Sequence, residues 1–217
     1  DSAGYNIPQG GEYMRPIYSL TSNNSESSNR FSAYIQDTYK FKSRWGVFSL
    51  NAGVRVSYWD WNKELLLSPR VSLGLIPNAN ENITLRIATG IYYQSPFYKE
   101  VRDTLTANGI TAVQLNKDIK SQRSIQLVVG ADYHFKMVGR PFKFTAEAYY
   151  KKLNNLIPYN VDNVRIVYYG ENCAHGYATG VDFKLFGEFV KGTDSWITFS
   201  IMDTKEKING SGWLPRP

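Results

Sequence analysis

The chain lacks the long apolar runs that helical membrane proteins need. No stretch of 18 or more apolar residues occurs in its 217 residues, so a transmembrane helix is excluded. We also find no convincing amphipathic helix. The first residues, Asp1 to Tyr5, have neither a basic start nor an apolar core, so they are not a signal peptide.

Side chains for metal or nucleophilic chemistry are scarce. The chain has one cysteine, Cys173, and two histidines, His134 and His175. Cys173 and His175 stand two residues apart without further ligands, which falls short of a zinc site. No third group completes a catalytic triad. The sequence therefore predicts no enzyme, no catalytic residue, no metal and no cofactor.

Alternation of apolar and polar residues is the pattern that is present instead. In 47–58, Leu50 and Val54 fall on one side, while Asn51 and Arg55 fall on the other. This period of two is the mark of a β-strand with two unlike faces. The pattern recurs along the chain, less regularly in the first and third segments. We expect eight strands, at 30–42, 47–58, 66–76, 82–94, 123–135, 142–152, 178–189 and 196–204.

These segments are long, and the links between them alternate in length. Strands of roughly 10–14 residues are what a tilted strand needs to cross a bilayer, whereas ordinary strands have about 5–6. Short turns at 43–46, 77–81, 136–141 and 190–195 alternate with links at 59–65, 95–122 and 159–177, the first of them only modestly long. In outer-membrane barrels the short turns are periplasmic and the long loops extracellular. The predicted fold class is all-β, with about eight antiparallel up-and-down transmembrane β-barrel strands.

Aromatic residues, which number 16 Tyr, 11 Phe and 5 Trp, gather near the strand ends. Outer-membrane barrels carry such girdles at both membrane interfaces. The expected periplasmic level holds Tyr39, Phe41, Trp45, Phe48, Tyr133, Phe135, Phe142, Phe144, Phe186, Phe189 and Trp196. The expected outer level holds Tyr58, Trp59, Trp61, Tyr92, Tyr93, Tyr150, Tyr159 and Tyr177.

Six short motifs resemble strands of the TonB-dependent receptors, in the family order. They are Tyr34 to Asp37 (YxQD), Leu50 to Arg55 (LxxGxR), Pro69-Arg70, Leu85 to Pro96 (LRxxxGxYxxxP), Ala146 to Lys151 (EAYYK) and Gly176 to Asp182, where Asp182 replaces the usual Glu. The sequences of these motifs are most similar to those of receptors from Bacteroides-like bacteria. The resemblance implies a barrel of about 22 strands, closed by an N-terminal plug on which the TonB complex acts.

The resemblance also implies a location and a set of partners. We expect a fragment of a larger barrel in the bacterial outer membrane, with the plug and the TonB box outside this chain. Residues 1–29 are then an extracellular loop segment, 30–205 the barrel strands, and 206–217 the start of a further extracellular loop. The expected partners are outer-membrane lipid or lipopolysaccharide, the TonB complex through the plug, and an imported small ligand of unknown identity. The basic residues that give the net charge of +6 are spread along the chain, so no nucleic acid is expected.

Two sets of residues are candidates for function. The first set consists of charges on the polar sides of the strands, which would face the lumen and bond to the plug: Arg55, Arg86, Lys143, Glu147, Lys151, Asp182 and Lys184. The second consists of loop residues that could contact a ligand: Tyr93, Gln94, Tyr98, Lys99, Arg102, Tyr159, Tyr168 and Tyr169.

Two other functions fit the same strands. A small passive eight-strand barrel, porin-like or structural, would insert into liposomes by itself. A soluble all-β binding module would stay monomeric without detergent. The TonB-dependent importer requires a plug upstream and further strands downstream in the native chain.

Overall fold

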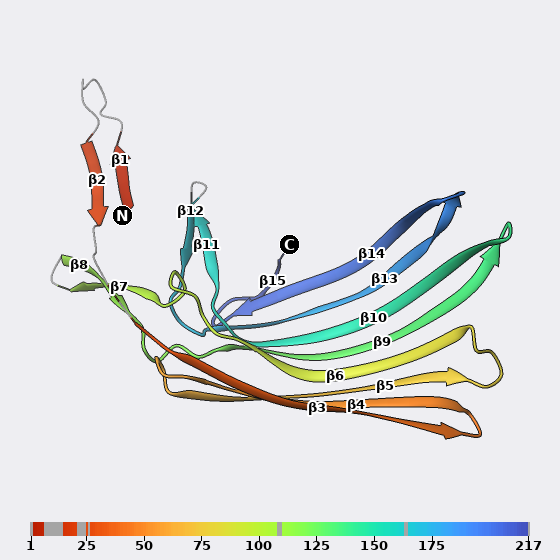
Figure 1. The fold of residues 1–217 in the computed structure, drawn as a ribbon. Helices are drawn as coiled ribbons and strands as arrows, with labels where there is room; N and C mark the ends of the chain where they lie inside the picture. Colours follow the sequence, from red (N-terminus) through yellow and green to blue (C-terminus); the bar gives the residue numbers. More distant parts are fainter. Residues whose placement is uncertain are drawn as a thin grey trace.

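The computed structural model describes residues 2–6, 15–20, 25, 27–107, 110–162 and 165–216. All regular structure in these residues is β-structure, arranged as one curved sheet with three separate hairpins (Figure 1). No helix long and apolar enough to cross a membrane occurs among them.

Eight long strands and one short one form the main sheet. They are β3 (Arg30–Ser43), β4 (Gly46–Trp59), β5 (Glu64–Pro77), β6 (Ile83–Gln94), β9 (Gln122–Met137), β10 (Arg140–Leu156), β13 (Ala174–Val190), β14 (Thr193–Ile208) and β15 (Trp213–Pro215). Their order is β15-β14-β13-β10-β9-β6-β5-β4-β3, and every pairing is antiparallel. The prediction of long antiparallel up-and-down strands is confirmed, and most strands extend slightly beyond the predicted ends.

Three two-stranded hairpins stand outside this sheet. They are β1 (Ser2–Asn6) with β2 (Arg15–Leu20), β7 (Arg102–Ala107) with β8 (Ile110–Leu115), and β11 (Tyr159–Asp162) with β12 (Arg165–Tyr168). Figure 1 shows all three at the same end of the sheet, where the long links lie. We call this the long-link end, and the opposite end the turn end. The sequence pattern does not indicate these hairpins, because their strands have only four to six residues.

The turn end is made of tight connections. The turn between β9 and β10 consists of Val138 and Gly139, whose φ angles are 53° and 73°. Positive φ at both central residues is the geometry that matches the twist of a two-residue hairpin. Such turns hold neighbouring strands in register and add little surface, which is why the long strands dominate this end of the molecule.

The register keeps one face of the main sheet apolar and the other polar. Two adjacent rungs across β5, β6, β9, β10, β13 and β14 illustrate this separation. One rung reads Leu75, Leu85, Ala131, Ala146, Phe183 and Phe199, and the next reads Gly74, Arg86, Gly130, Glu147, Asp182 and Ser200. Since a slip of one residue would exchange the faces, the pairing of six strands in this register makes the two faces continuous.

Aromatic rings stack along the turn end, as the predicted girdle requires. Phe41 stacks on Phe48 with ring centroids 5.1 Å apart, and Tyr133 stacks on Phe135 at 5.4 Å. At the long-link end Tyr150 lies 6.3 Å from Tyr177. Trp59 differs from the expectation for a girdle residue: it is buried beneath the links. Tyr92, Phe186 and Trp196 differ as well, because the register places them on the polar face.

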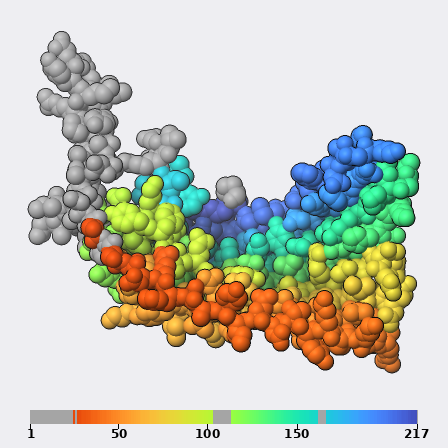
Figure 2. Space-filling view, in the orientation of Figure 1, coloured from red at the N-terminus to blue at the C-terminus, as the bar shows by residue number. Residues whose placement is uncertain are grey.

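Figure 2 shows the curvature of the sheet in space-filling form. The surface is hollowed between the hairpin of β11 and β12 at the long-link end and the raised turn end of β13 and β14. The main sheet thus forms a trough. Its long-link end carries the links and hairpins, and its turn end carries only short turns.

Candidate functional site

A charged cluster occupies the polar face in the half nearer the turn end. Asp132 on β9 receives hydrogen bonds from Arg86 on β6 and from the Thr145 hydroxyl on β10, the latter at 2.7 Å. Lys143 Nζ lies 3.4 Å from the same carboxylate, and Arg86 Nη2 lies 3.5 Å from Glu147 Oε2. Two cations and two carboxylates therefore neutralise one another across three strands.

Gly130 makes room for this cluster. Its position lies beside Arg86, and a Cβ built there would meet Arg86 Nη2 at 3.2 Å. The missing side chain lets the guanidinium lie across β9 and reach both Asp132 and Glu147. A glycine in a strand interior usually marks such a close approach.

All seven predicted lumen residues lie on the polar face. Arg86, Lys143 and Glu147 belong to the cluster around Asp132. Lys151 lies 5.0 Å from the Tyr149 ring, and Lys184 lies 5.9 Å from the Trp196 ring. Strand pairing places the remaining two on this face: Arg55 pairs with Ser68, and Asp182 pairs with Glu147.

A small hydrophobic core lies under the links at the long-link end. Trp59, Val101, Ile119 and Ile157 are buried, with Ile119 only 1% exposed. They come from β4, from the link between β6 and β9, and from the link after β10. We call these links, with the residues that pack on this core, the loop layer. Its contacts join segments of the chain that lie far apart in the sequence.

Polar side chains fasten the loop layer to the strands. Glu64 Oε2 accepts hydrogen bonds from the backbone N–H and the hydroxyl of Ser121, at 3.0 and 2.6 Å. Asn172 accepts from Lys120 N at 2.6 Å and donates to the Lys120 carbonyl at 2.9 Å. Asn116 donates to the Gly170 carbonyl at 2.8 Å. These bonds connect the link after β6 with both β5 and the link after β10.

Glu100 is a buried carboxylate within this layer. Its oxygens accept hydrogen bonds from the Phe97 N–H at 3.0 Å and from the Gln122 amide at 3.1 Å. Burial raises the pKa of Glu100 above its ordinary value, although both hydrogen bonds act in the opposite direction.

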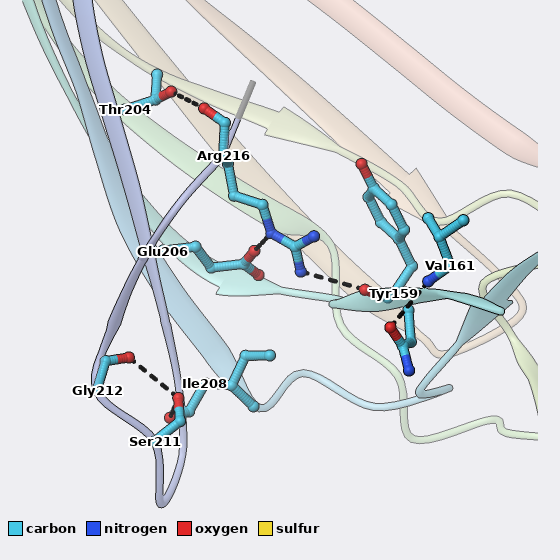
Figure 3. A network of polar contacts seen from close by, with 9 residues as sticks. Tyr159, Val161, Thr204, Glu206, Ile208, Ser211, Gly212 and Arg216 are labelled. Atoms are coloured by element: carbon cyan, nitrogen blue, oxygen red, sulfur yellow. Dashed lines mark hydrogen bonds and ion pairs between the residues drawn. The ribbon is translucent and has the colours of Figure 1, made fainter.

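Arg216 fastens the last described segment to the hairpin of β11 and β12. It pairs with the carboxylate of Glu206, and its Nη2 donates to the Tyr159 carbonyl at 3.1 Å (Figure 3). Its guanidinium also lies 4.8 Å from the Tyr159 ring. The hydroxyl of Thr204 donates to the Arg216 carbonyl. The chain thus turns back along β14 instead of running away from the sheet.

The predicted ligand-contact residues divide into four groups. Tyr98 and Tyr169 are 49% and 47% exposed, and Gln94 and Lys99 are exposed as well. Tyr159 and Tyr168 lie together with centroids 5.9 Å apart, and Tyr168 packs on the loop-layer core. Tyr93 pairs with Arg123 in the register between β6 and β9. It lies on the same side of β6 as Ile91, which is the apolar face. Arg102 is half-buried.

The cysteine and the histidines remain apart from any candidate chemistry. Burial raises the pKa of the Cys173 thiol, which disfavours its reactive thiolate form. His175 contacts the Trp213 ring edge-on at 5.6 Å, and His134 is exposed on the polar face. Within the described ranges no group of three or more His, Cys, Asp or Glu could hold a metal ion.

Comparison with known families identifies this architecture. The family model described as TonB dependent receptor-like, beta-barrel matches residues 1–217. The chain belongs to this family. Its place is therefore the bacterial outer membrane, where the polar side of a barrel strand faces the interior and the apolar side faces lipid.

One solved structure gives a similar fold. The outer membrane transporter YddB from Escherichia coli aligns with a TM-score of 0.58 at 17% identity, over 82% of this chain. The alignment covers 25% of that transporter, so the chain spans about a quarter of its length. A search of the curated proteins gave no match. The receptor-barrel fold and the link to outer-membrane transport are thus established at the level of the family.

Sequence reasoning missed several residues that organise the receptor barrel. Asp132 belongs to neither set of candidates drawn from the sequence, yet it binds three neighbours. Glu64 and Ser121 are 57 positions apart, so no local pattern connects them. Arg30 and Arg70 lie in the two segments whose alternation is least regular. The available signal was that each shares one side of its strand with polar residues: Arg30 with Ser32 and Gln36, and Arg70 with Ser72.

Proposed function

We propose that this chain forms part of the barrel wall of a TonB-dependent importer that takes up a small ligand and catalyses no reaction. The polar face lines the lumen. The apolar face lies against outer-membrane lipid, including lipopolysaccharide. The long-link end is extracellular, and the turn end is periplasmic.

The observation that carries this proposal is the separation of an apolar and a polar face across the eight long strands. The apolar face presents Leu85, Val129 and Val181 side by side, each well exposed for lack of any covering layer. A bilayer removes that exposure, whereas water does not. The strands of 12 to 17 residues suit a tilted crossing of the bilayer.

The polar face supports a lumen that is filled by a plug. Arg55, Lys151, Asp182 and Lys184 form no ion pair with the described residues. We infer that the last three of these charges, together with the edges of the Arg86 cluster, form hydrogen bonds to a plug that lies outside this chain. The exposed loop residues Gln94, Tyr98, Lys99 and Tyr169, and with them Arg102, Tyr159 and Tyr168, are the proposed extracellular contacts of the ligand. Tyr93 belongs instead to the outer aromatic girdle.

The test is direct binding of TonB to the full-length protein. Outer membranes carrying the full-length receptor are solubilised and passed over the immobilised periplasmic domain of TonB, with and without deletion of the N-terminal region. We expect retention of the intact receptor and loss of retention after the deletion. A protein that is not retained, yet conducts ions steadily in a planar bilayer, would be a passive pore.

A further inference from the structure

Three arginines line the polar face in its outer half. Arg30 begins β3 at the long-link end, Arg55 lies on β4, and Arg70 lies on β5. All three side chains are exposed. A hollow of about 260 Å³ is lined by all three, and an adjoining hollow of about 450 Å³ is lined by Arg55 and Arg70. We call this region the arginine hollow.

The arginine hollow differs from the Arg86 cluster in its balance of charge. Arg86 and Lys143 are matched by Asp132 and Glu147. Among the residues that the structure describes, no carboxylate pairs with Arg30, Arg55 or Arg70, and no acidic residue lines either hollow. Three positive charges on one wall repel one another, so an anion placed among them is stabilised.

Neighbouring side chains hold the three guanidiniums in position. Arg30 lies 4.4 Å from the Trp59 ring and donates to the Pro96 carbonyl at 3.1 Å. Arg70 lies 4.5 Å from the Tyr92 ring. Arg55 donates to the Ser32 hydroxyl at 3.0 Å. Each guanidinium has five N–H donors, so these contacts fix the groups and leave donors available.

The rest of the lining suits the same kind of ligand. Ser32 and Ser57 contribute hydroxyls, Asn51 and Gln36 contribute amides, and Tyr92 contributes a ring. Arginine forks bind carboxylate and phosphate oxygens in pairs, and hydroxyl and amide groups complete such a shell. The bond from Arg30 to Pro96 also places the hollow next to the link between β6 and β9, on the side from which a ligand would arrive.

We propose that the arginine hollow binds the oxyanion, a carboxylate or a phosphate, of an acidic ligand during import. This assignment rests on the proposed importer function and narrows its substrate to a negatively charged small molecule. Arg55 and Arg70 make the principal contacts, and Arg30 contributes from the rim.

The experiment measures anion binding by the full-length receptor in detergent. Citrate and inorganic phosphate are titrated separately by calorimetry at constant ionic strength. The variants are Arg55→Gln and Arg70→Gln, which keep an amide of similar length but remove the charge. Lys40→Gln is the matched control, because Lys40 lies on the same face toward the turn end of β3 and lines neither hollow.

We expect saturable binding of at least one anion, weakened tenfold or more by each arginine variant and unchanged within twofold by Lys40→Gln. A preference for citrate over phosphate, or the reverse, identifies which oxyanion the ligand carries. Binding that is absent, or equal in all variants, refutes the proposal.

Two further readouts separate the alternatives. If no anion binds and both arginine variants lower the melting temperature of the receptor while Lys40→Gln does not, the arginines hold a carboxylate of the plug, which also refutes the proposal.

TonB retention is measured on the same preparations. A receptor that binds TonB but no anion refutes this inference alone, whereas one that binds an anion but not TonB refutes the importer function alone.

Discussion

The two faces of the main sheet are built on different principles. On the apolar face Leu85, Ala131 and Val129 contact neighbours of the same kind, and stacked rings such as Phe41 and Phe48 close the turn end. On the polar face Arg86, Asp132 and Glu147 bond across three strands. The stability of the apolar face depends on the medium that it contacts. The polar face satisfies its polar groups by pairing them with one another. A barrel wall between lipid and an aqueous interior requires this difference.

The largest expected effect comes from placing a charge on the apolar face. Val129→Arg puts a guanidinium at a position that is 49% exposed, near the middle of β9. At the bilayer midplane this costs about 2–4 kcal/mol. We expect less full-length receptor in the outer-membrane fraction and loss of heat-modifiable migration. Val128→Arg, one residue away on the polar face, is the control, and equal damage by both variants would contradict the assignment of the faces.

A somewhat smaller effect is expected from removing the centre of the polar network. Asp132→Ala leaves Arg86, Lys143 and Thr145 without their shared acceptor. The Asp132 side chain is 6% exposed, while Arg86 and Lys143 are about 40% exposed, so we expect a loss of about 2–3 kcal/mol in the free energy of unfolding. Urea denaturation of the receptor measures it. Asp182→Ala, on the same face without an ion pair among the described residues, should cost less than about 1 kcal/mol.

Adding one methyl group tests the space under Arg86. Gly130→Ala places a Cβ 3.2 Å from Arg86 Nη2, so the guanidinium must shift and weaken its bond to Glu147. We expect a loss of about 1 kcal/mol, the size of one hydrogen bond, measured by the urea midpoint. The control is Gly74→Ala on the same rung, where the nearest atom is 3.8 Å away. Tolerance of both substitutions would show that the arrangement of Arg86 is not held by close packing.

The smallest effect concerns pH at the long-link end. Since burial raises the pKa of Glu100 in the folded state, the packed loop layer binds the proton more tightly than the opened one. Its stability should therefore fall as pH rises from the ordinary value of 4.5 through the raised one. Hydrogen exchange of residues 95–102, corrected for the intrinsic rate, should show faster opening over this range. Glu100→Gln should abolish that slope, and an unchanged slope would assign the effect to another group.

The sequence predicted the strands well because a two-residue period needs no knowledge of distant contacts. All eight long strands and the short turns between them follow from it. The hairpin of β11 and β12 and the loop-layer core do not, since Trp59, Ile119 and Ile157 meet only after the sheet has formed. Leu66 illustrates the limit: it breaks the polar pattern of its face and is buried.

The candidate site was predictable in part for the same reason. Arg55 and Arg86 stand out where alternation is clear. Arg70 is hidden by the neighbouring Pro69 and by leucines on both sides of β5, and Asp37 lies on the apolar side of β3. Partners such as Asp132 for Arg86, 46 positions away, are set by register between strands rather than by local sequence.

The most direct test of the account is the mass of the native protein that carries these peptides, measured in a bacterial outer-membrane fraction. The account predicts a protein several times the 24.7 kDa of this chain, with a plug before these strands and further strands after them. A native protein of about 24.7 kDa in that fraction would contradict it and would indicate a small complete barrel instead.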